Sequence, residues 1–452
     1  MNVAILGTGY VGLTTGACLA FLGHRVICVD PDESKIDALQ RGEVPFYEPH
    51  LDGLIADARP NLRFTTDYSE AIPDAQVVFI AVGTPPGPTG APDLRYLQAA
   101  AEGVGKLLGP HFTVIVNKST VPIGSGNWVG AIVREAAERR GHGRGCFAVA
   151  SNPEFLREGS ALHDSLYPDR VVIGADEAQT AEVLYTLYRP MLDQTFQPPP
   201  FLPRPDRMGG VPLISTDLAS AELIKYAANA FLALKISYIN EIGQLAEKVG
   251  ADIAHVARGI GLDARIGTRF LQAGIGWGGS CFGKDTAALV STASEYGLDM
   301  PIVKAAREVN RRQRERVVEK LLGELKILKG RTIGLLGLAF KPHTDDLREA
   351  PALDVARHLL ERGARVKAHD PVAMDRFKRE HAGMDLTLVS DSREVAREAD
   401  ALVLVTEWPQ YLELDWESLA SVMRTPILLD TRHVLDRARV TRAGFRYMTL
   451  AG

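Results

Sequence analysis

The feature that most constrains the fold is a cluster of glycines between two strand-like segments near the start of the chain. Gly7 to Gly12 (GTGYVG) follow the apolar run Val3–Leu6 and precede a stretch of helical composition that reaches Leu22. A second apolar run, Arg25–Val29, ends at Asp30. A strand, a glycine-rich turn, a helix and a second strand in this order predict a βαβ unit with parallel strands.

This arrangement also predicts a ligand. The glycines allow a tight turn, the approach of a pyrophosphate to the backbone, and close packing of the helix on the strand. A carboxylate at Asp30 can accept hydrogen bonds from both hydroxyls of an adenosine ribose and would repel a 2′-phosphate, so NAD is favoured over NADP. The alternative is a purely structural turn. We predict NAD binding by the residues Gly7, Gly9, Tyr10, Val11, Gly12 and Asp30.

Length and charge limit the classes of function. The chain has 452 residues, more than one hydrophobic core accommodates, so two or three domains are expected. Lys and Arg total 51 against 56 acidic residues, a net charge of -5. This balance offers no basic field for nucleic acid or for an anionic membrane surface. An anionic substrate would need a few well-placed cations and backbone amides.

The cysteines suggest neither a disulfide framework nor a metal site. They are Cys18, Cys28, Cys146 and Cys281, and no two of them form a CxxC pair that would indicate zinc. No apolar run approaches the length of a membrane span. The expected compartment is a reducing cytoplasm.

Further strand signals continue the alternation with helical stretches. Val77–Val82, Thr113–Val116 and Val171–Ile173 are apolar runs that predict a doubly wound parallel sheet, hence an α/β fold. A proline-rich stretch from Pro198, which ends at Gly209-Gly210, predicts a loop or linker. A long helix is predicted over Thr216–Val249, with a length of roughly 50 Å.

The last third of the chain repeats features of the first. GHRV from Gly23, which leads to Asp30-Pro31, is matched by GARV from Gly363, which leads to Asp370-Pro371. We predict two Rossmann-like domains joined by a helical middle, although any two βαβ units share some pattern. The second copy has GLLGLA from Gly334 and lacks the full fingerprint, so the two copies should bind different nucleotides or bind them differently. The predicted segments are 1–197 for NAD, 198–213 as linker, 214–312 as central helical and dimerisation domain, and 313–452 for the second nucleotide.

A second glycine-rich segment precedes Cys281. Gly274 to Ser280 (GIGWGGS) give a backbone that can wrap a ligand closely. Cys281 lies near the start of a helix predicted over Thr286–Ser294, where the helix N-terminus favours the thiolate. The alternative, a buried structural cysteine, suits Cys18 and Cys28, which lie in apolar runs. We predict that Cys281 is a nucleophile.

Two pairs of polar residues occur at helical spacing. Lys225 and Asn229 are four apart on the long helix among apolar neighbours, which indicates partial desolvation of the lysine. A surface lysine with a buried stem is the alternative. Glu154 and Glu158 are also four apart, and an ordinary solvated face is the alternative there.

Four segments together resemble the UDP-glucose/GDP-mannose dehydrogenase family: GGSCFxKD up to Asp285, NPEFL from Asn152, KYxxNA from Lys225, and FKPxTxDxRE from Phe340. The resemblance runs from residue 1 to about residue 436. The segment 221–233 most resembles the bacterial UDP-glucose 6-dehydrogenase branch.

The resemblance implies roles for individual residues. Around the nucleophile Cys281, the implied catalytic residues are Lys225, Asn229, Asp285, Thr120 and Glu154. Further positions at NAD are Lys35, Thr84, Thr120, Glu158, Lys284 and Arg348. Positions at the nucleotide sugar are Glu154, Phe155, Leu156, Lys225, Asn229, Phe270, Leu271, Gln272, Ala273, Gly274, Gly278, Phe340, Lys341 and Arg432. Arg265 matches an arginine that enters the active site of the partner in a homodimer.

The implied activity is the NAD-dependent, four-electron oxidation of UDP-glucose to UDP-glucuronate through a thiohemiacetal and a thioester on Cys281. The same chemistry on GDP-mannose or a UDP-N-acetylhexosamine is an alternative, and a non-catalytic NAD and nucleotide sensor is another. The chain departs from the family at Ala273 and Gly283, where proline is common, and at Trp277, where the family has Tyr or Phe.

Overall fold

The computed structural model describes residues 1–85, 87, 92–139 and 146–451. It divides into two compact units, each of which combines two stretches of the chain. The first unit consists of Met1–Ala227 and Ala287–Tyr296, and the second of Ala228–Thr286 and Gly297–Gly452. Each unit is described separately below.

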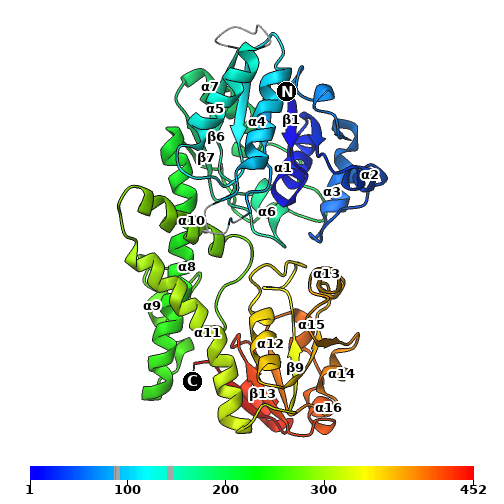
Figure 1. The fold of residues 1–452 in the computed structure, drawn as a ribbon, viewed down its shortest axis with the longest axis vertical. Helices are drawn as coiled ribbons and strands as arrows, with labels where there is room; N and C mark the ends of the chain where they lie inside the picture. Colours follow the sequence, from blue (N-terminus) through cyan, green and yellow to red (C-terminus); the bar gives the residue numbers. More distant parts are fainter. Residues whose placement is uncertain (86, 88–91, 140–145, 452) are drawn as a thin grey trace. The chain divides into compact units, whose positions relative to one another are not determined.

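The first unit is built on a twisted sheet with the strand order β3-β2-β1-β4-β5-β6-β7-β8 (Figure 1). Neighbouring strands are parallel except β6 and β7, which are antiparallel. The predicted doubly wound sheet is thus confirmed, with the last two strands, β7 and β8, running opposite to the others. The strands are β1 (Asn2–Leu6), β2 (Arg25–Val29), β3 (Leu62–Thr65), β4 (Val77–Ile80), β5 (Thr113–Asn117), β6 (Phe147–Ser151), β7 (Val171–Ala175) and β8 (Leu213–Thr216).

Helices cover both faces of this sheet because its strands are apolar on both sides. Val3 and Ile5 of β1 pack with α1, α3 and α7 on one face. Ala4 and Leu6 point to the other face, where they pack with α4 and α5. The helices are α1 (Tyr10–Phe21), α2 (Glu33–Arg41), α3 (Leu51–Ala58), α4 (Arg95–Leu107), α5 (Ser125–Glu138), α6 (Ala161–Leu166) and α7 (Ala178–Leu192).

The proline-rich segment lies between α7 and β8, and it forms neither a helix nor a strand, as predicted. It packs on the first unit through Phe201, whose ring stacks on His50 at 5.2 Å and closes over Gly53. Tyr167 donates a hydrogen bond of 2.9 Å to the carbonyl of Leu202. The segment is therefore an anchored loop of the first unit.

The second unit contains a sheet with the order β11-β10-β9-β12-β13-β14, which repeats the order of the first six strands of the other sheet. Gly337 follows β9 with φ +104°, and Gly7 follows β1 with φ +103°. These matches confirm the predicted duplication of architecture. The strands are β9 (Thr332–Leu336), β10 (Arg365–His369), β11 (Leu386–Leu388), β12 (Ala401–Leu404), β13 (Ile427–Asp430) and β14 (Arg446–Thr449).

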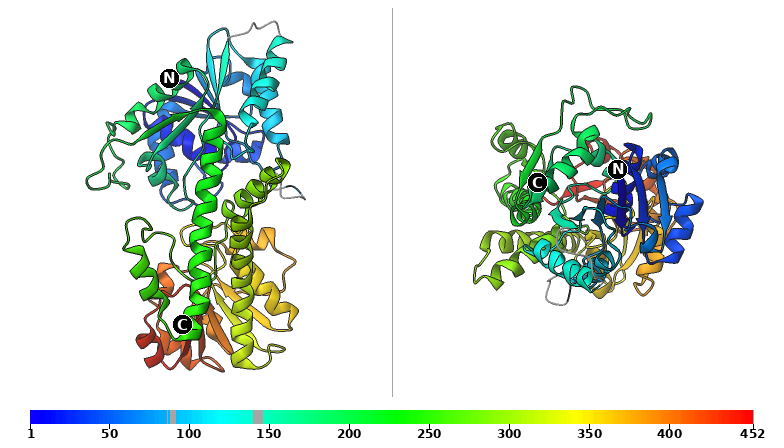
Figure 2. Two further views of the ribbon diagram at one scale, coloured as in Figure 1. Left: turned by 90° about the vertical axis from the view of Figure 1, so that its left-hand side faces the viewer. Right: turned by 90° about the horizontal axis from the view of Figure 1, so that it is seen from above.

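The long helix α8 (Leu218–Val249) confirms the helix predicted over Thr216–Val249. In the second unit α11 (Pro301–Leu325) runs alongside it (Figure 2), and Ser237 donates a hydrogen bond of 2.7 Å to the carbonyl of Ala306. The remaining helices are α9 (Ile253–Gly261), α10 (Phe282–Glu295), α12 (Pro351–Glu361), α13 (Met374–Glu380), α14 (Ser392–Ala396), α15 (Pro409–Leu412), α16 (Trp416–Ser421) and α17 (Arg437–Arg442). In the part of the chain that the structure describes, no helix has the length and hydropathy of a membrane span.

Candidate active site

The turn between β1 and α1 has the shape that a pyrophosphate requires. Gly7 has φ +103°, and a Cβ there would lie 2.6 Å from the carbonyl oxygen of Ala81. A Cβ on Gly9 would meet no atom within 4 Å, so the backbone faces open space at the point where α1 begins. A free helix N-terminus next to such a space is an anion-binding arrangement. These residues fit a dinucleotide.

Asp30 follows β2 and is buried at 7% exposure. Its Oδ2 accepts hydrogen bonds of 2.9 Å from the amide and the hydroxyl of Thr8, and its Oδ1 accepts one of 3.1 Å from the amide of Asp32. Lys35 places its ammonium 3.8 Å from Oδ2. The carboxylate is thereby fixed next to the glycine-rich turn, and the predicted residues Asp30 and Lys35 are brought together.

The carboxyl ends of β4 and β5 bring two further predicted residues together. The hydroxyl of Thr84 donates a hydrogen bond of 2.9 Å to the carbonyl of Thr120. In open α/β sheets ligands bind outside the carboxyl ends of the strands, and both threonines lie there.

Glu48 is a buried residue at this site that the sequence did not reveal. Its carboxylate accepts hydrogen bonds from the hydroxyl of Tyr10 and, at 2.6 and 2.7 Å, from the amides of Gly159 and Ala161. It therefore ties the glycine-rich turn to the segment that carries Glu158. The only sequence signal is a carboxylate between aromatic residues in a loop, which is too common to identify a site.

Glu154 and Lys225 form a buried ion pair in the first unit. The ammonium of Lys225 lies 2.8 Å from Glu154 Oε1, and the side chains are 5% and 7% exposed. Glu154 Oε2 accepts a hydrogen bond of 2.9 Å from the amide of Leu156, and Lys225 lies 5.5 Å from the centre of the Phe155 ring. The alternative that Lys225 is a solvated surface lysine is therefore wrong. Glu154 and Glu158 are also buried, so the alternative of a solvated face is wrong for them too.

Cys281 immediately precedes α10. The amide of Asp285 donates a hydrogen bond of 2.8 Å to the Cys281 carbonyl, and the hydroxyl of Ser280 lies 3.6 Å from Sγ. Cys281 is half-buried, whereas burial of Cys18 and Cys28 raises the pKa of each thiol to about 12. A partly accessible thiol at a helix N-terminus is the reactive kind.

The helix α10 starts at Phe282 and not at Thr286 as predicted. A Cβ on Gly283 would overlap the end of the Glu349 side chain, so any other residue there would require Glu349 to shift. The earlier start gives Cys281 the helix N-terminus directly.

Asp285 lies one turn into α10 and is 1% exposed. The Asn229 amide donates a hydrogen bond of 2.6 Å to its Oδ2, and the Lys284 ammonium lies 2.8 Å from its Oδ1. Within the second unit these three predicted residues and Cys281 are held by α8 and α10.

The glycine-rich segment before Cys281 is held by side chains from two helices. Asn240 of α8 accepts a hydrogen bond of 2.7 Å from the amide of Gly274. Asn310 of α11 accepts one of 2.8 Å from the amide of Trp277 and donates one of 2.9 Å to its carbonyl. The indole of Trp277 is buried, and its N–H donates to Ser237 at 3.3 Å. The departure from the family pattern at Trp277 therefore has a hydrogen-bond partner on α8.

Three of the residues predicted at the nucleotide sugar, Gly278, Lys341 and Arg432, lie around Phe340 in the second unit. A Cβ on Gly279 would meet the Phe340 ring at 2.7 Å, and one on Gly278 would meet Phe340 Cβ at 3.1 Å. Arg432 donates a hydrogen bond of 2.9 Å to the Phe340 carbonyl, and the Lys341 ammonium lies 5.5 Å from the ring centre.

The other residues predicted at the two nucleotides in this unit differ in burial and in their contacts. Leu271 and Ala273 are buried and Gln272 is exposed. Phe270 has φ +65°, and its ring lies 6.3 Å from that of Phe282. Arg348 pairs with Asp346 at 2.8 Å.

Arg265 differs from the other predicted residues. Its side chain is 89% exposed, and it forms a two-pronged ion pair with Asp263 at 2.6 Å. The contacts within the described residues do not connect it to Cys281.

The chain matches known proteins over nearly its whole length. Models of the UDP-glucose/GDP-mannose dehydrogenase family match its NAD binding domain at residues 1–192, its central domain at 219–312 and its UDP binding domain at 334–437. The chain is 44% identical to UDP-glucose 6-dehydrogenase TuaD of Bacillus subtilis, over 99% of this chain and 93% of that protein. It is 46% identical to the UDP-glucose 6-dehydrogenase of Pseudomonas aeruginosa, over 99% of this chain and 96% of that protein.

Two solved structures are similar over the whole length. A UDP-glucose dehydrogenase from Pyrobaculum islandicum has a TM-score of 0.89 and 40% identity, and the match covers 100% of this chain and 97% of that one. A UDP-D-ManNAc dehydrogenase from Pyrococcus horikoshii has a TM-score of 0.83 and 26% identity, with 100% and 99% covered. With its NAD-binding first domain, the chain belongs to the UDP-glucose/GDP-mannose dehydrogenase family.

Proposed function

We propose that this protein oxidises UDP-glucose to UDP-glucuronate at the expense of two NAD. The observation that carries the proposal is that this one chain has both the buried Glu154–Lys225 pair and a cysteine, Cys281, at the head of α10. A non-catalytic sensor would have no need of these groups. Identities of 44–46% over nearly the full length to UDP-glucose 6-dehydrogenases support UDP-glucose as substrate.

The first oxidation converts the C6 alcohol to an aldehyde. Each oxidation removes a hydride, which NAD would accept when bound at the glycine-rich turn, and releases a proton. The hydroxyl proton goes to Lys225 as a neutral amine, because an amine is a general base and an ammonium is not. Glu154, 2.8 Å from the amine nitrogen, orients it and stabilises the ammonium that forms.

The second oxidation uses the thiol. Cys281 adds to the aldehyde carbon to give a thiohemiacetal, from which loss of a second hydride leaves a thioester. The Lys225 ammonium and the Asn229 amide stabilise the oxyanions. Water, positioned by Asp285 with Glu154 or Thr120, then hydrolyses the thioester to the carboxylate and regenerates the thiol.

The protein acts as a homodimer formed through α8. Phe231, Tyr238 and Leu245 are seven residues apart and 62, 51 and 60% exposed, so they form an apolar row along one side of the helix. A two-fold interface is self-complementary, and such a row can pack on its own copy. Arg265 then serves the nucleotide sugar of the partner. We place this assembly in the cytoplasm, where its free cysteines stay reduced.

The test is turnover against a panel of nucleotide sugars, with NADH counted after a limiting amount of each sugar is exhausted. We expect UDP-glucose to be preferred over GDP-mannose and UDP-N-acetylhexosamines, with two NADH formed per sugar. A ratio of one would contradict the thioester, and a preference for another sugar would change the substrate while keeping the chemistry.

A further inference from the structure

The ion pair with Glu154 presents a difficulty for the proposed chemistry. A carboxylate 2.8 Å from an amine favours the protonated form of that amine. The first oxidation requires Lys225 to be neutral. Some other feature of the first unit must therefore oppose the effect of Glu154.

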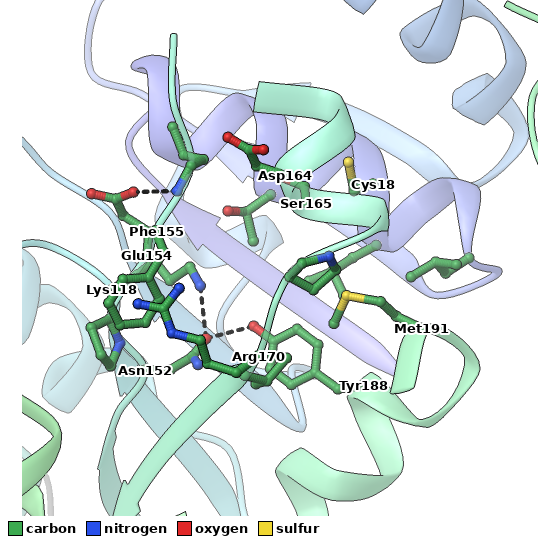
Figure 3. A pocket seen from close by; sticks show the side chains of 17 residues that line it. Cys18, Lys118, Asn152, Glu154, Phe155, Asp164, Ser165, Arg170, Tyr188 and Met191 are labelled. Atoms are coloured by element: carbon green, nitrogen blue, oxygen red, sulfur yellow. Dashed lines mark hydrogen bonds between the residues drawn. The ribbon is translucent and has the colours of Figure 1, made fainter. Parts of the chain in front are cut away.

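Lys118, which follows β5, is a second lysine next to this pair. Its ammonium donates a hydrogen bond of 2.8 Å to Oδ1 of Asn152, two residues before Glu154 in the chain. Tyr188 of α7 donates one of 2.6 Å to the same oxygen, and the Asn152 amide donates one of 2.7 Å to the carbonyl of Val172. These bonds fix the Lys118 ammonium in one place (Figure 3).

Among the residues that the structure describes, no carboxylate is bonded to the Lys118 ammonium. It lines a pocket together with Glu154 and Phe155, and the ring of Phe155 also lies next to Lys225. In the described part of the chain its direct partners are the neutral side chains of Asn152 and Tyr188. The Lys118 ammonium thus lies within electrostatic reach of Glu154, the carboxylate that pairs with Lys225.

The charges around Lys118 act in both directions. The pKa of Lys118 is lowered to about 8, chiefly by burial and also by the like charge of Lys225, against the opposite effect of Glu154. Because the repulsion between two charges is mutual, the charge on Lys118 lowers the pKa of Lys225 as well. A neighbouring cation is one of the known ways to make a lysine reactive in its neutral form.

Other titratable groups also line the pocket. Arg170, before β7, stacks on Phe155 at 3.6 Å, and Asp164 of α6 is paired with Arg157. Burial raises the pKa of the Tyr188 hydroxyl well above its ordinary value and raises that of the Cys18 thiol to about 12, so both groups are neutral. Lys118 is therefore the second lysine within electrostatic reach of Glu154.

We propose that Lys118 is a positioning residue for the first proton transfer. Held by Asn152 next to the Glu154–Lys225 pair, its charge competes with Lys225 for Glu154 and so favours the neutral amine. This inference rests on the proposed function, in which Lys225 is the base.

The experiment is the pH profile of kcat/KM for NADH formation from UDP-glucose by the full-length protein, between about pH 6 and 10. The rate should rise with pH as the base loses its proton. Lys118→Met should move this rise upward by about one pH unit, so activity near neutral pH falls roughly tenfold and recovers at high pH. Lys118→Arg keeps the charge at every pH of this range and should leave the rise at or below its wild-type position.

Two further variants make the result decisive. Lys118→Gln is a second neutral variant in case Lys118→Met does not fold, and NAD binding checks the fold of each. Tyr188→Phe removes a hydrogen bond from the same Asn152 oxygen without changing a charge, and it should not move the rise. A loss of rate that is equal at every pH would show a merely structural role and overturn the inference.

Lys225→Met separates failure of the inference from failure of the mechanism. If this variant keeps the wild-type rise, Lys225 is not the base and the proposed mechanism and the inference both fail. If the rise disappears in Lys225→Met but is unmoved in Lys118→Met, the inference alone fails. Should another nucleotide sugar be the substrate, the same profiles are measured with it.

Discussion

The carbonyl oxygen of Gly7 occupies the space that a Cβ on Gly12 would need. Gly12 is therefore required for α1 to pack against its own turn. Gly9 is different, because its φ of −73° suits any residue and a Cβ there would meet no atom within 4 Å. Two glycines of one fingerprint thus serve two purposes, the packing of the helix and the room for a ligand.

The pair Gly9→Ala and Gly12→Ala tests this division. Gly12→Ala should destabilise the protein by about 3 kcal/mol or more, since the added methyl meets backbone that cannot move aside. Gly9→Ala should leave stability unchanged and weaken NAD binding by roughly tenfold or more, because the methyl fills the space for the pyrophosphate. Thermal unfolding and NAD titration of both variants measure these effects. Unchanged NAD affinity in Gly9→Ala would place the pyrophosphate elsewhere.

Asp30 should determine the choice of cofactor. With its carboxylate at the ribose, the wild type should prefer NAD to NADP by about 100-fold in kcat/KM, since juxtaposed like charges cost several kcal/mol. Asp30→Ala should narrow this preference. Asp32→Asn is the matched control, because Asp32 caps α2 and lies outside the turn. Equal use of both cofactors by the wild type would contradict the placement.

Cys281→Ser should lose about 10⁴-fold or more of the overall turnover, since a serine hydroxyl is far harder to ionise than a thiol. Any ester that the serine forms should hydrolyse slowly and appear as an acyl-enzyme by intact mass after incubation with UDP-glucose and NAD. Cys146→Ser, at the other partly buried cysteine, is the control and should keep its activity. A near-normal rate in Cys281→Ser would mean that another residue is the nucleophile.

Arg265 should act in the partner subunit. Each site would combine Cys281 of one chain with Arg265 of the other, so Cys281→Ala and Arg265→Ala are both expected to be inactive alone. After subunit exchange, a heterodimer contains one intact and one doubly damaged site. Activity should then return toward half the wild-type level per heterodimer.

The control is the same exchange with Cys281→Ala alone, which should stay inactive. If exchange is demonstrated by mass and no activity returns in the mixture, Arg265 acts within its own chain. The exposure of its side chain in a single chain is consistent with either a partner's site or a surface ion pair, and this experiment distinguishes them.

The parts of the fold and site that could be predicted are those whose signal is local in sequence. The turn from Gly7, the strand that ends at Asp30 and the helix that carries Lys225 each depend on residues within one or two elements. Glu48 and Lys118 were missed because their partners are 111 and 34 residues away. A position after a parallel strand was the one available signal for Lys118.

The direction of a strand and the first residue of a helix could not be predicted from the sequence either. β7 has the same apolar composition whether it runs parallel or antiparallel to β6, so its reversal leaves no local mark. The start of α10 at Phe282 includes Gly283, and because glycine is a poor helix former the local composition indicates a later start.

The repeated sheets carry an aspartate at the same place, and its surroundings have diverged. Asp370 follows β10 as Asp30 follows β2, but its oxygens accept from the amides of Leu338, Ala339, Val372 and Ala373 and from the indole of Trp408. A carboxylate has about four lone-pair sites, so its acceptor capacity is saturated by the protein itself. Restoring the missing glycines would therefore not turn the second domain into a dinucleotide receptor, since no acceptor is left for a ribose.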